Sequence, residues 1–129
     1  MATDLFETDA HFRELVARAS ERTGSDLERI CRRGPERELT RTRHLQPLLV
    51  CVSLGYARHL AERGIAPGLV AGHSLGEISA LAAAGVVSNE EAVDLAAQRG
   101  ECMEAAASKL SGGMIAVLTP EREKLCRRL

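Results

Sequence analysis

The stretch Leu69–Gly85 reads LVAGHSLGEISALAAAG and places a serine between two glycines, directly after a short apolar run. The run Leu69–Ala71 is short, apolar and bounded by glycines, as a central strand of a parallel sheet would be. The segment Gly76–Ala84 is almost wholly apolar and predicts a helix, which Gly85 ends. The stretch therefore predicts a strand, a tight turn and a helix in succession.

The turn Gly72–Gly76 fits the G-x-S-x-G pattern of a nucleophile elbow. We expect glycines on both sides of Ser74 because a Cβ there would meet the neighbouring strand and helix. Such a turn holds the hydroxyl outward, near the backbone N–H of Leu75, which can stabilise the oxyanion formed in acyl transfer. The alternative interpretation is a glycine-rich turn whose serine only caps the helix.

The sequence does not identify a general base for this serine. His73 is adjacent, but neighbouring side chains leaving a strand point in opposite directions. We therefore expect His73 to be a hydrogen-bonded, partly buried residue and not the base. The other histidines, His11, His44 and His59, lie in segments that we expect to be exposed or peripheral.

A single arginine interrupts the apolar face of the long helix predicted after Asn89. The apolar positions of that face are Ala92, Leu95, Ala96, Met103, Ala106 and Leu110. Arg99 falls among them, where an unpaired charge is costly. Two anionic partners fit this position equally well. One is a protein carboxylate such as that of Glu77, and the other is a substrate carboxylate held in a bidentate fork.

The rest of the chain predicts more helices and only one further strand. The expected helices cover residues 9–23, 26–33 and 47–63, with an extended connection over 41–46 and a last helix from Pro120. The expected strand covers Met114–Leu118. Alternating strands and helices indicate an α/β protein with parallel pairing, and two strands make an incomplete sheet.

The composition excludes several classes of protein. Apolar residues make up 45% of the 129 residues, which favours a folded core, and aromatic residues only 2%, which argues against a base-stacking surface for nucleic acid. The 17 basic and 18 acidic side chains nearly balance. The four cysteines are scattered, so neither a metal site nor a disulfide framework is expected. With no signal peptide and no membrane-spanning run in the sequence, we expect a cytoplasmic protein without a membrane partner.

Four motifs together resemble the malonyl-CoA:acyl carrier protein transacylase family and the related acyltransferase domains of fatty acid and polyketide synthesis. They are Gln46-Pro47, the run AGHSLGE at 71–77, Gln98-Arg-Gly100 with Met103, and Gly112-Gly-Met114. The resemblance implies that residues 1–110 are part of the large, α/β-hydrolase-like subdomain with its nucleophile elbow. It also implies that residues 111–129 begin the small ferredoxin-like subdomain.

The resemblance also implies a ping-pong reaction without a bound cofactor or metal. Ser74 would take an acyl group from malonyl-CoA or a similar acyl-CoA and pass it to the phosphopantetheine thiol of an acyl carrier protein. Arg99 would hold the free carboxylate of the acyl group, and Leu75 would offer its backbone N–H to the oxyanion. Gln46 and His73 would line the site.

Two family features are absent from the sequence, namely an N-terminal Gly-Gln-Gly-Ser-Gln loop and a catalytic histidine far downstream. We therefore expect an internal portion of an acyltransferase, impaired alone, with a second chain as a candidate source of the missing groups. Two alternatives remain open. One is a serine esterase, which would not need Arg99, and the other is a non-catalytic fragment or interaction module.

Overall fold

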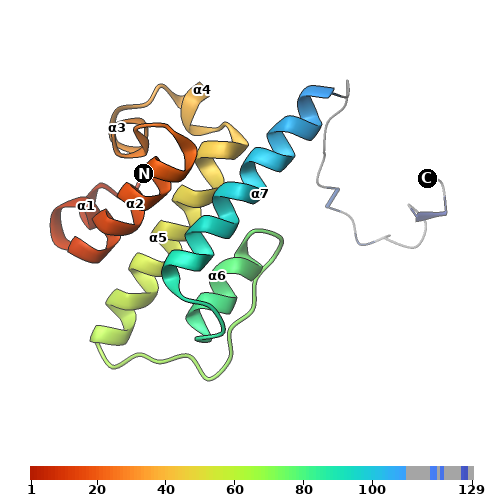
Figure 1. Ribbon diagram of the computed structural model, residues 1–129. Coiled ribbons are helices and arrows are strands. Elements are labelled where there is room, and N and C mark those ends of the chain that lie inside the picture. Colours follow the sequence, from red (N-terminus) through yellow and green to blue (C-terminus); the bar gives the residue numbers. More distant parts are fainter. Residues whose placement is uncertain (110–116, 119, 121–125, 128–129) are drawn as a thin grey trace.

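The computed structural model describes residues 1–109, 117, 118, 120, 126 and 127. Within these residues the chain forms seven helices (Figure 1). They are α1 (Thr3–Thr8), α2 (Ala10–Thr23), α3 (Leu27–Arg33), α4 (Glu36–Leu39), α5 (Thr42–Glu62), α6 (Gly76–Ala83) and α7 (Asn89–Lys109). The long helices α5 and α7 pack together, α2 packs on both of them, and α6 packs on α5 and α7 away from α2.

Local side chains begin and end the first helices. The Asp9 carboxylate caps α2 by accepting from the Phe12 N–H at 3.0 Å, and Asp26 caps α3 in the same way at 2.9 Å. Gly24 ends α2 with a φ of 62°, a conformation that glycine adopts without a Cβ penalty. These ends confirm the sequence prediction, which did not include α1.

The helix α5 begins five residues before the predicted start at Pro47. The prediction of an extended connection over 41–46 is therefore wrong. Pro47 has no N–H to donate, yet it lies fully buried within the helix. The Glu104 carboxylate of α7 supports the early start, because it accepts from the Arg43 N–H at 3.5 Å and pairs with Arg41. The Arg41 guanidinium in turn holds the pKa of Glu104 below its ordinary value.

The helix α7 begins with a capping box. The Ser88 hydroxyl accepts from the Glu91 N–H at 3.1 Å, and the Glu91 carboxylate accepts from the Ser88 N–H at 2.7 Å. Ser88, and not the predicted Asn89, is therefore the capping residue. This arrangement lowers the pKa of Glu91, because the backbone N–H of Ser88 stabilises the charged form. Asn89 instead contacts His11 of α2 at 3.1 Å.

The crossing of α5 and α7 requires a glycine. A Cβ added to Gly100 would lie 2.7 Å from the carbonyl oxygen of Thr42 and 3.0 Å from the Cα of Arg43. Both are backbone atoms, which cannot rotate away. The position next to Arg99 is therefore the point at which the two long helices approach closely.

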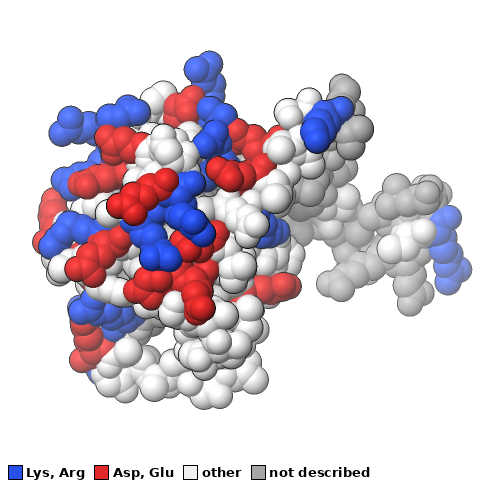
Figure 2. Space-filling view, viewed as in Figure 1, with Lys and Arg blue, Asp and Glu red and all other residues white. Residues whose placement is uncertain are grey.

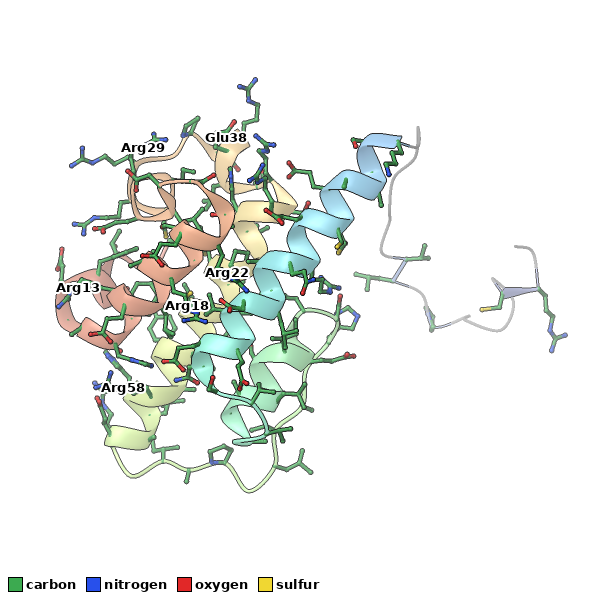
Figure 3. The ribbon with its side chains drawn as sticks, in the orientation of Figure 1. Arg13, Arg18, Arg22, Arg29, Glu38 and Arg58 are labelled. Carbon is green, nitrogen blue, oxygen red and sulfur yellow. The ribbon has the colours of Figure 1, made fainter. Side chains whose placement is uncertain are left out.

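The core is formed mainly by α1, α2, α3, α5 and α7. Its fully buried large side chains are Leu5, Phe12, Leu15, Val16, Leu27, Leu48, Val50 and Val93. The helix α5 is not buried on all sides, because Leu49 is 38% exposed. On the other side of the helix bundle, α2 is joined to α7 by ion pairs. Arg18 and Arg22 extend from α2 to Asp94 of α7, at 2.8 and 3.0 Å (Figure 3).

The predicted strand Leu69–Ala71 is not formed in the described part of the chain. Residues 65–72 belong to no helix or strand, and Leu69 is 83% exposed. A strand requires a neighbouring backbone to accept and donate its hydrogen bonds, and no described residue offers one. The described part is therefore helical, and the expected parallel sheet is not present in it.

The other predicted strand, Met114–Leu118, lies largely outside the described residues. The same holds for the helix expected from Pro120 and for the subdomain expected over residues 111–129. Among the helices that the structure describes, none combines the length and apolar character needed to cross a membrane.

Candidate functional site

The backbone at Ser74 lies in the left-handed region, a strained conformation of the kind found at functional turns. Its φ is 55°, which is rare for a residue with a side chain. A Cβ added to Gly72 would lie 2.0 Å from the carbonyl carbon of Gly76 and 2.3 Å from the nitrogen of Glu77. The turn therefore requires glycine at position 72, as the sequence predicts. Gly76 differs, because no described atom lies within 4 Å of its added Cβ.

The backbone N–H that follows the serine is available to a ligand. The N–H groups of Gly76 and Glu77 bond to the carbonyls of His73 and Ser74 at 3.0 and 3.2 Å. The Leu75 N–H has no acceptor among the described residues. It lies at the N-terminal end of α6, where the helix dipole favours negative charge. This donor has the character that an oxyanion hole requires.

Arg99 reaches the serine from α7. Its Nη2 donates to the Ser74 Oγ at 3.0 Å, and its Nη1 donates to the Gln46 Oε1 at 2.6 Å. No carboxylate of the described residues forms an ion pair with this half-buried guanidinium. Glu77, the protein partner considered from the sequence, is exposed and does not bond to it. The acceptors of Arg99 are thus neutral.

Gln46 connects this arginine to a second residue of α7. Its side chain is buried, with the residue 6% exposed, and its Nε2 donates to the Met103 Sδ at 3.1 Å. Met103, Gln46, Arg99 and Ser74 therefore form one continuous hydrogen-bonded series across α5, α7 and the turn. The contact of Met103 was not predicted, although its position four residues after Arg99 places it on the same helix face.

The histidines differ from the predictions in two places. His73 is exposed, not partly buried, and its ring forms no hydrogen bond with the described residues. His44 is buried, not peripheral. Its Nδ1 donates to the Glu38 carbonyl at 2.8 Å, and its Nε2 lies 3.0 Å from the Ser25 hydroxyl. These partners come from α4 and from the α2–α3 loop, so the burial depends on tertiary contacts.

The described residues supply no general base at the serine. The Ser74 Oγ accepts a hydrogen bond from Arg99, and no described histidine forms a hydrogen bond with it. Groups of three or more metal-binding side chains are likewise absent from the part that the structure describes. The site therefore consists of a hydroxyl, a guanidinium, an amide and a free backbone N–H.

The surface around this turn carries little charge. Figure 2 shows acidic and basic side chains spread over the region of α1 to α4, whereas the region of α6 and the preceding segment is mostly uncharged. Exposed apolar side chains in this region include Ile65, Leu69, Leu81 and Val86. Exposed apolar patches of this kind mark surfaces that contact other protein, a membrane or a ligand.

The chain belongs to the acyl transferase domain family, whose model matches residues 1–128. The malonyl CoA-acyl carrier protein transacylase of Bacillus subtilis (strain 168) is 38% identical over 125 residues, which are 97% of this chain and 39% of that protein. A transacylase structure from Streptococcus pneumoniae matches with a TM-score of 0.81 and 41% identity, over 99% of this chain and 43% of that one.

A third similar protein was solved with a carrier protein. In that structure the malonyl-transacylase is in complex with a type II polyketide synthase acyl carrier protein. It matches with a TM-score of 0.77 and 34% identity, over 99% of this chain and 43% of that one. The family resemblance of the sequence is thereby confirmed. The chain spans less than half the length of each of these relatives.

Proposed function

We propose that this chain carries the nucleophile and the carboxylate-binding residue of a malonyl-type acyltransferase. The reaction moves the acyl group from coenzyme A to the phosphopantetheine thiol of an acyl carrier protein. The observation that carries the proposal is the contact between Arg99 and Ser74, because it places a cation without a carboxylate partner beside a hydroxyl in an elbow turn.

In the first half-reaction the Ser74 Oγ attacks the thioester carbonyl carbon. A C–O bond forms, the C–S bond breaks, and coenzyme A leaves as a thiol after protonation. The Leu75 N–H stabilises the oxyanion of the tetrahedral intermediate. The hydroxyl proton passes to a base outside the described residues. In the second half-reaction the carrier thiol attacks the serine ester, and the hydroxyl of Ser74 is restored.

Arg99 accounts for a preference for acyl groups that end in a carboxylate. In a malonyl group a single methylene separates the thioester carbonyl from the free carboxylate. A cation within hydrogen-bond distance of the attacking oxygen therefore matches the distance between the two ends of this substrate. The guanidinium can hold a carboxylate through two parallel hydrogen bonds. Acetyl-CoA offers no such group.

The chain alone should be a slow enzyme. Nucleophile and general base act as a unit, so a site without the base loses several orders of magnitude in rate. The second candidate, a serine esterase, uses the same elbow but has no need for Arg99. Turnover of a neutral ester that survives Arg99→Ala, with no malonyl preference, would favour it.

Intact-protein mass spectrometry tests the proposal. The protein is incubated separately with malonyl-CoA and acetyl-CoA, beside Ser74→Ala and Arg99→Ala. We expect a malonyl adduct that is lost in Ser74→Ala and weakened in Arg99→Ala, with acetyl labelling less affected by the arginine. The absence of any adduct on folded protein would contradict a competent first half-reaction in this chain.

A further inference from the structure

The residue that holds the half-buried Arg99 guanidinium is buried and neutral. A charged side chain that is fully buried is almost always paired, whereas one that is partly exposed can be held by a neutral acceptor. On the same helix, the carboxylate of Asp94 pairs with Arg18 of α2, and that of Glu104 pairs with Arg41, which directly precedes α5. Gln46 instead accepts from Arg99 through an amide oxygen at 2.6 Å. The amide positions the guanidinium without cancelling its charge.

Met103 fixes the direction of the Gln46 amide. The Met103 thioether can accept a hydrogen bond but cannot donate one, and it lies 3.1 Å from the Gln46 Nε2. A flipped amide would place its NH2 against the Arg99 Nη1, donor against donor. The thioether is also uncharged. The series from Met103 to Ser74 therefore orients the arginine through neutral groups at every step.

The backbone keeps these groups in register. Gln46 lies one turn after Thr42 and Arg43, the residues that the α7 backbone approaches at Gly100. Arg99 is the immediate neighbour of Gly100. The distance between the Gln46 amide and the guanidinium is therefore set close to the point at which α5 and α7 touch, which limits side-chain drift.

We propose that Gln46 is a specificity-determining positioning residue. Its neutral amide holds Arg99 against the nucleophile while leaving the positive charge to a substrate carboxylate, and thereby selects acyl-CoA thioesters that carry one. This inference rests on the proposed function. A carboxylate at position 46 would form an internal ion pair with Arg99 and compete with the carboxylate of the substrate.

The sharpest variant is Gln46→Glu, which keeps the size of the side chain and changes its charge. We expect the ratio of malonyl to acetyl labelling of Ser74 to fall at least about tenfold. Labelling by acetyl-CoA should change far less than labelling by malonyl-CoA, because the internal ion pair competes only with a carboxylate of the substrate. A residue with only a structural role would lower both labelling rates together.

Two further variants serve as controls. Gln98→Glu adds the same charge at an exposed position beside Arg99 in the sequence, and should leave the ratio within about twofold of the parent protein. Gln46→Leu keeps position 46 neutral but removes the acceptor. It should weaken malonyl labelling while retaining the preference for malonyl over acetyl, since the guanidinium stays unpaired.

Equilibrium binding separates this inference from the proposed reaction. In the Ser74→Ala protein, titration calorimetry compares malonyl-CoA with acetyl-CoA, with and without Gln46→Glu. Tighter binding of malonyl-CoA that Gln46→Glu abolishes supports the role of Gln46 even if acylation is never seen. An unchanged preference in folded Gln46→Glu protein, or no preference in the parent, overturns it.

Discussion

The substitution Gly100→Ala tests the close approach of α5 and α7. Its Cβ would lie 2.7 Å from the Thr42 oxygen and 3.2 Å from the Thr42 carbonyl carbon, so the two helices must separate by several tenths of an ångström. Alanine in a helix interior gains about 1 kcal/mol over glycine. Overpacking against rigid backbone costs up to about 3 kcal/mol. We therefore expect the free energy of unfolding to fall by about 2 kcal/mol.

Urea unfolding followed by far-UV circular dichroism measures this loss. Gly68→Ala is the matched control, because no atom lies within 4 Å of its added Cβ and its φ is not in the left-handed region. The control should be neutral or slightly stabilising. The displaced α7 should also weaken malonyl labelling of Ser74. A Gly100→Ala protein as stable as the parent would refute the close contact.

Three further predictions concern the turn, the ion pairs and the thiols. Gly72→Ala should reduce malonyl labelling, measured by intact mass, by more than about tenfold, because the added Cβ overlaps backbone atoms. Gly76→Ala is the control, since its added Cβ lies in open space, and it should lose far less labelling. Equal losses in the two variants would contradict the geometry of the turn. The arginines of α2 hold the pKa of Asp94 below its ordinary value. The ionised carboxylate therefore stabilises the fold fully at any pH above the ordinary pKa, and this contribution is lost as the pH falls through the lowered pKa. Urea unfolding at about pH 7 and about pH 3 should therefore show a smaller acid loss in Asp94→Asn, and an identical loss would contradict the pairing. Burial raises the pKa of Cys51 to about 12, so iodoacetamide should alkylate the exposed Cys102 in native protein but react with Cys51 only in urea. Equal rates of alkylation of the two cysteines in native protein would contradict the burial of Cys51.

The ends of α2 and α3 could be predicted because neighbouring residues decide them. Asp9, Asp26 and Gly24 act on backbone groups within a few positions, and their roles follow from the sequence alone. The sequence assigned Ser74 and Arg99 to one predicted site, and the structure brings their side chains together. Their direct contact was not predicted, because the two residues are 25 positions apart in the sequence and the contact depends on how α7 packs against the turn.

The other differences have tertiary causes. The burial of Pro47 and the support from Glu104 override the local preference against helix before proline. His44 is buried by partners 6 and 19 residues away. The run Leu69–Ala71 has the composition of a strand, but a strand also needs a neighbour that no single run of sequence supplies.

The positive φ of Ser74 has a consequence for the history of this chain. A residue with a Cβ held in the left-handed region costs on the order of 1 kcal/mol, and glycine or asparagine adopts it more readily. Selection for folding alone would thus replace this serine over time. Its presence is the outcome expected where the hydroxyl has been under selection. Relatives that have lost acyl transfer should carry glycine or asparagine at this position.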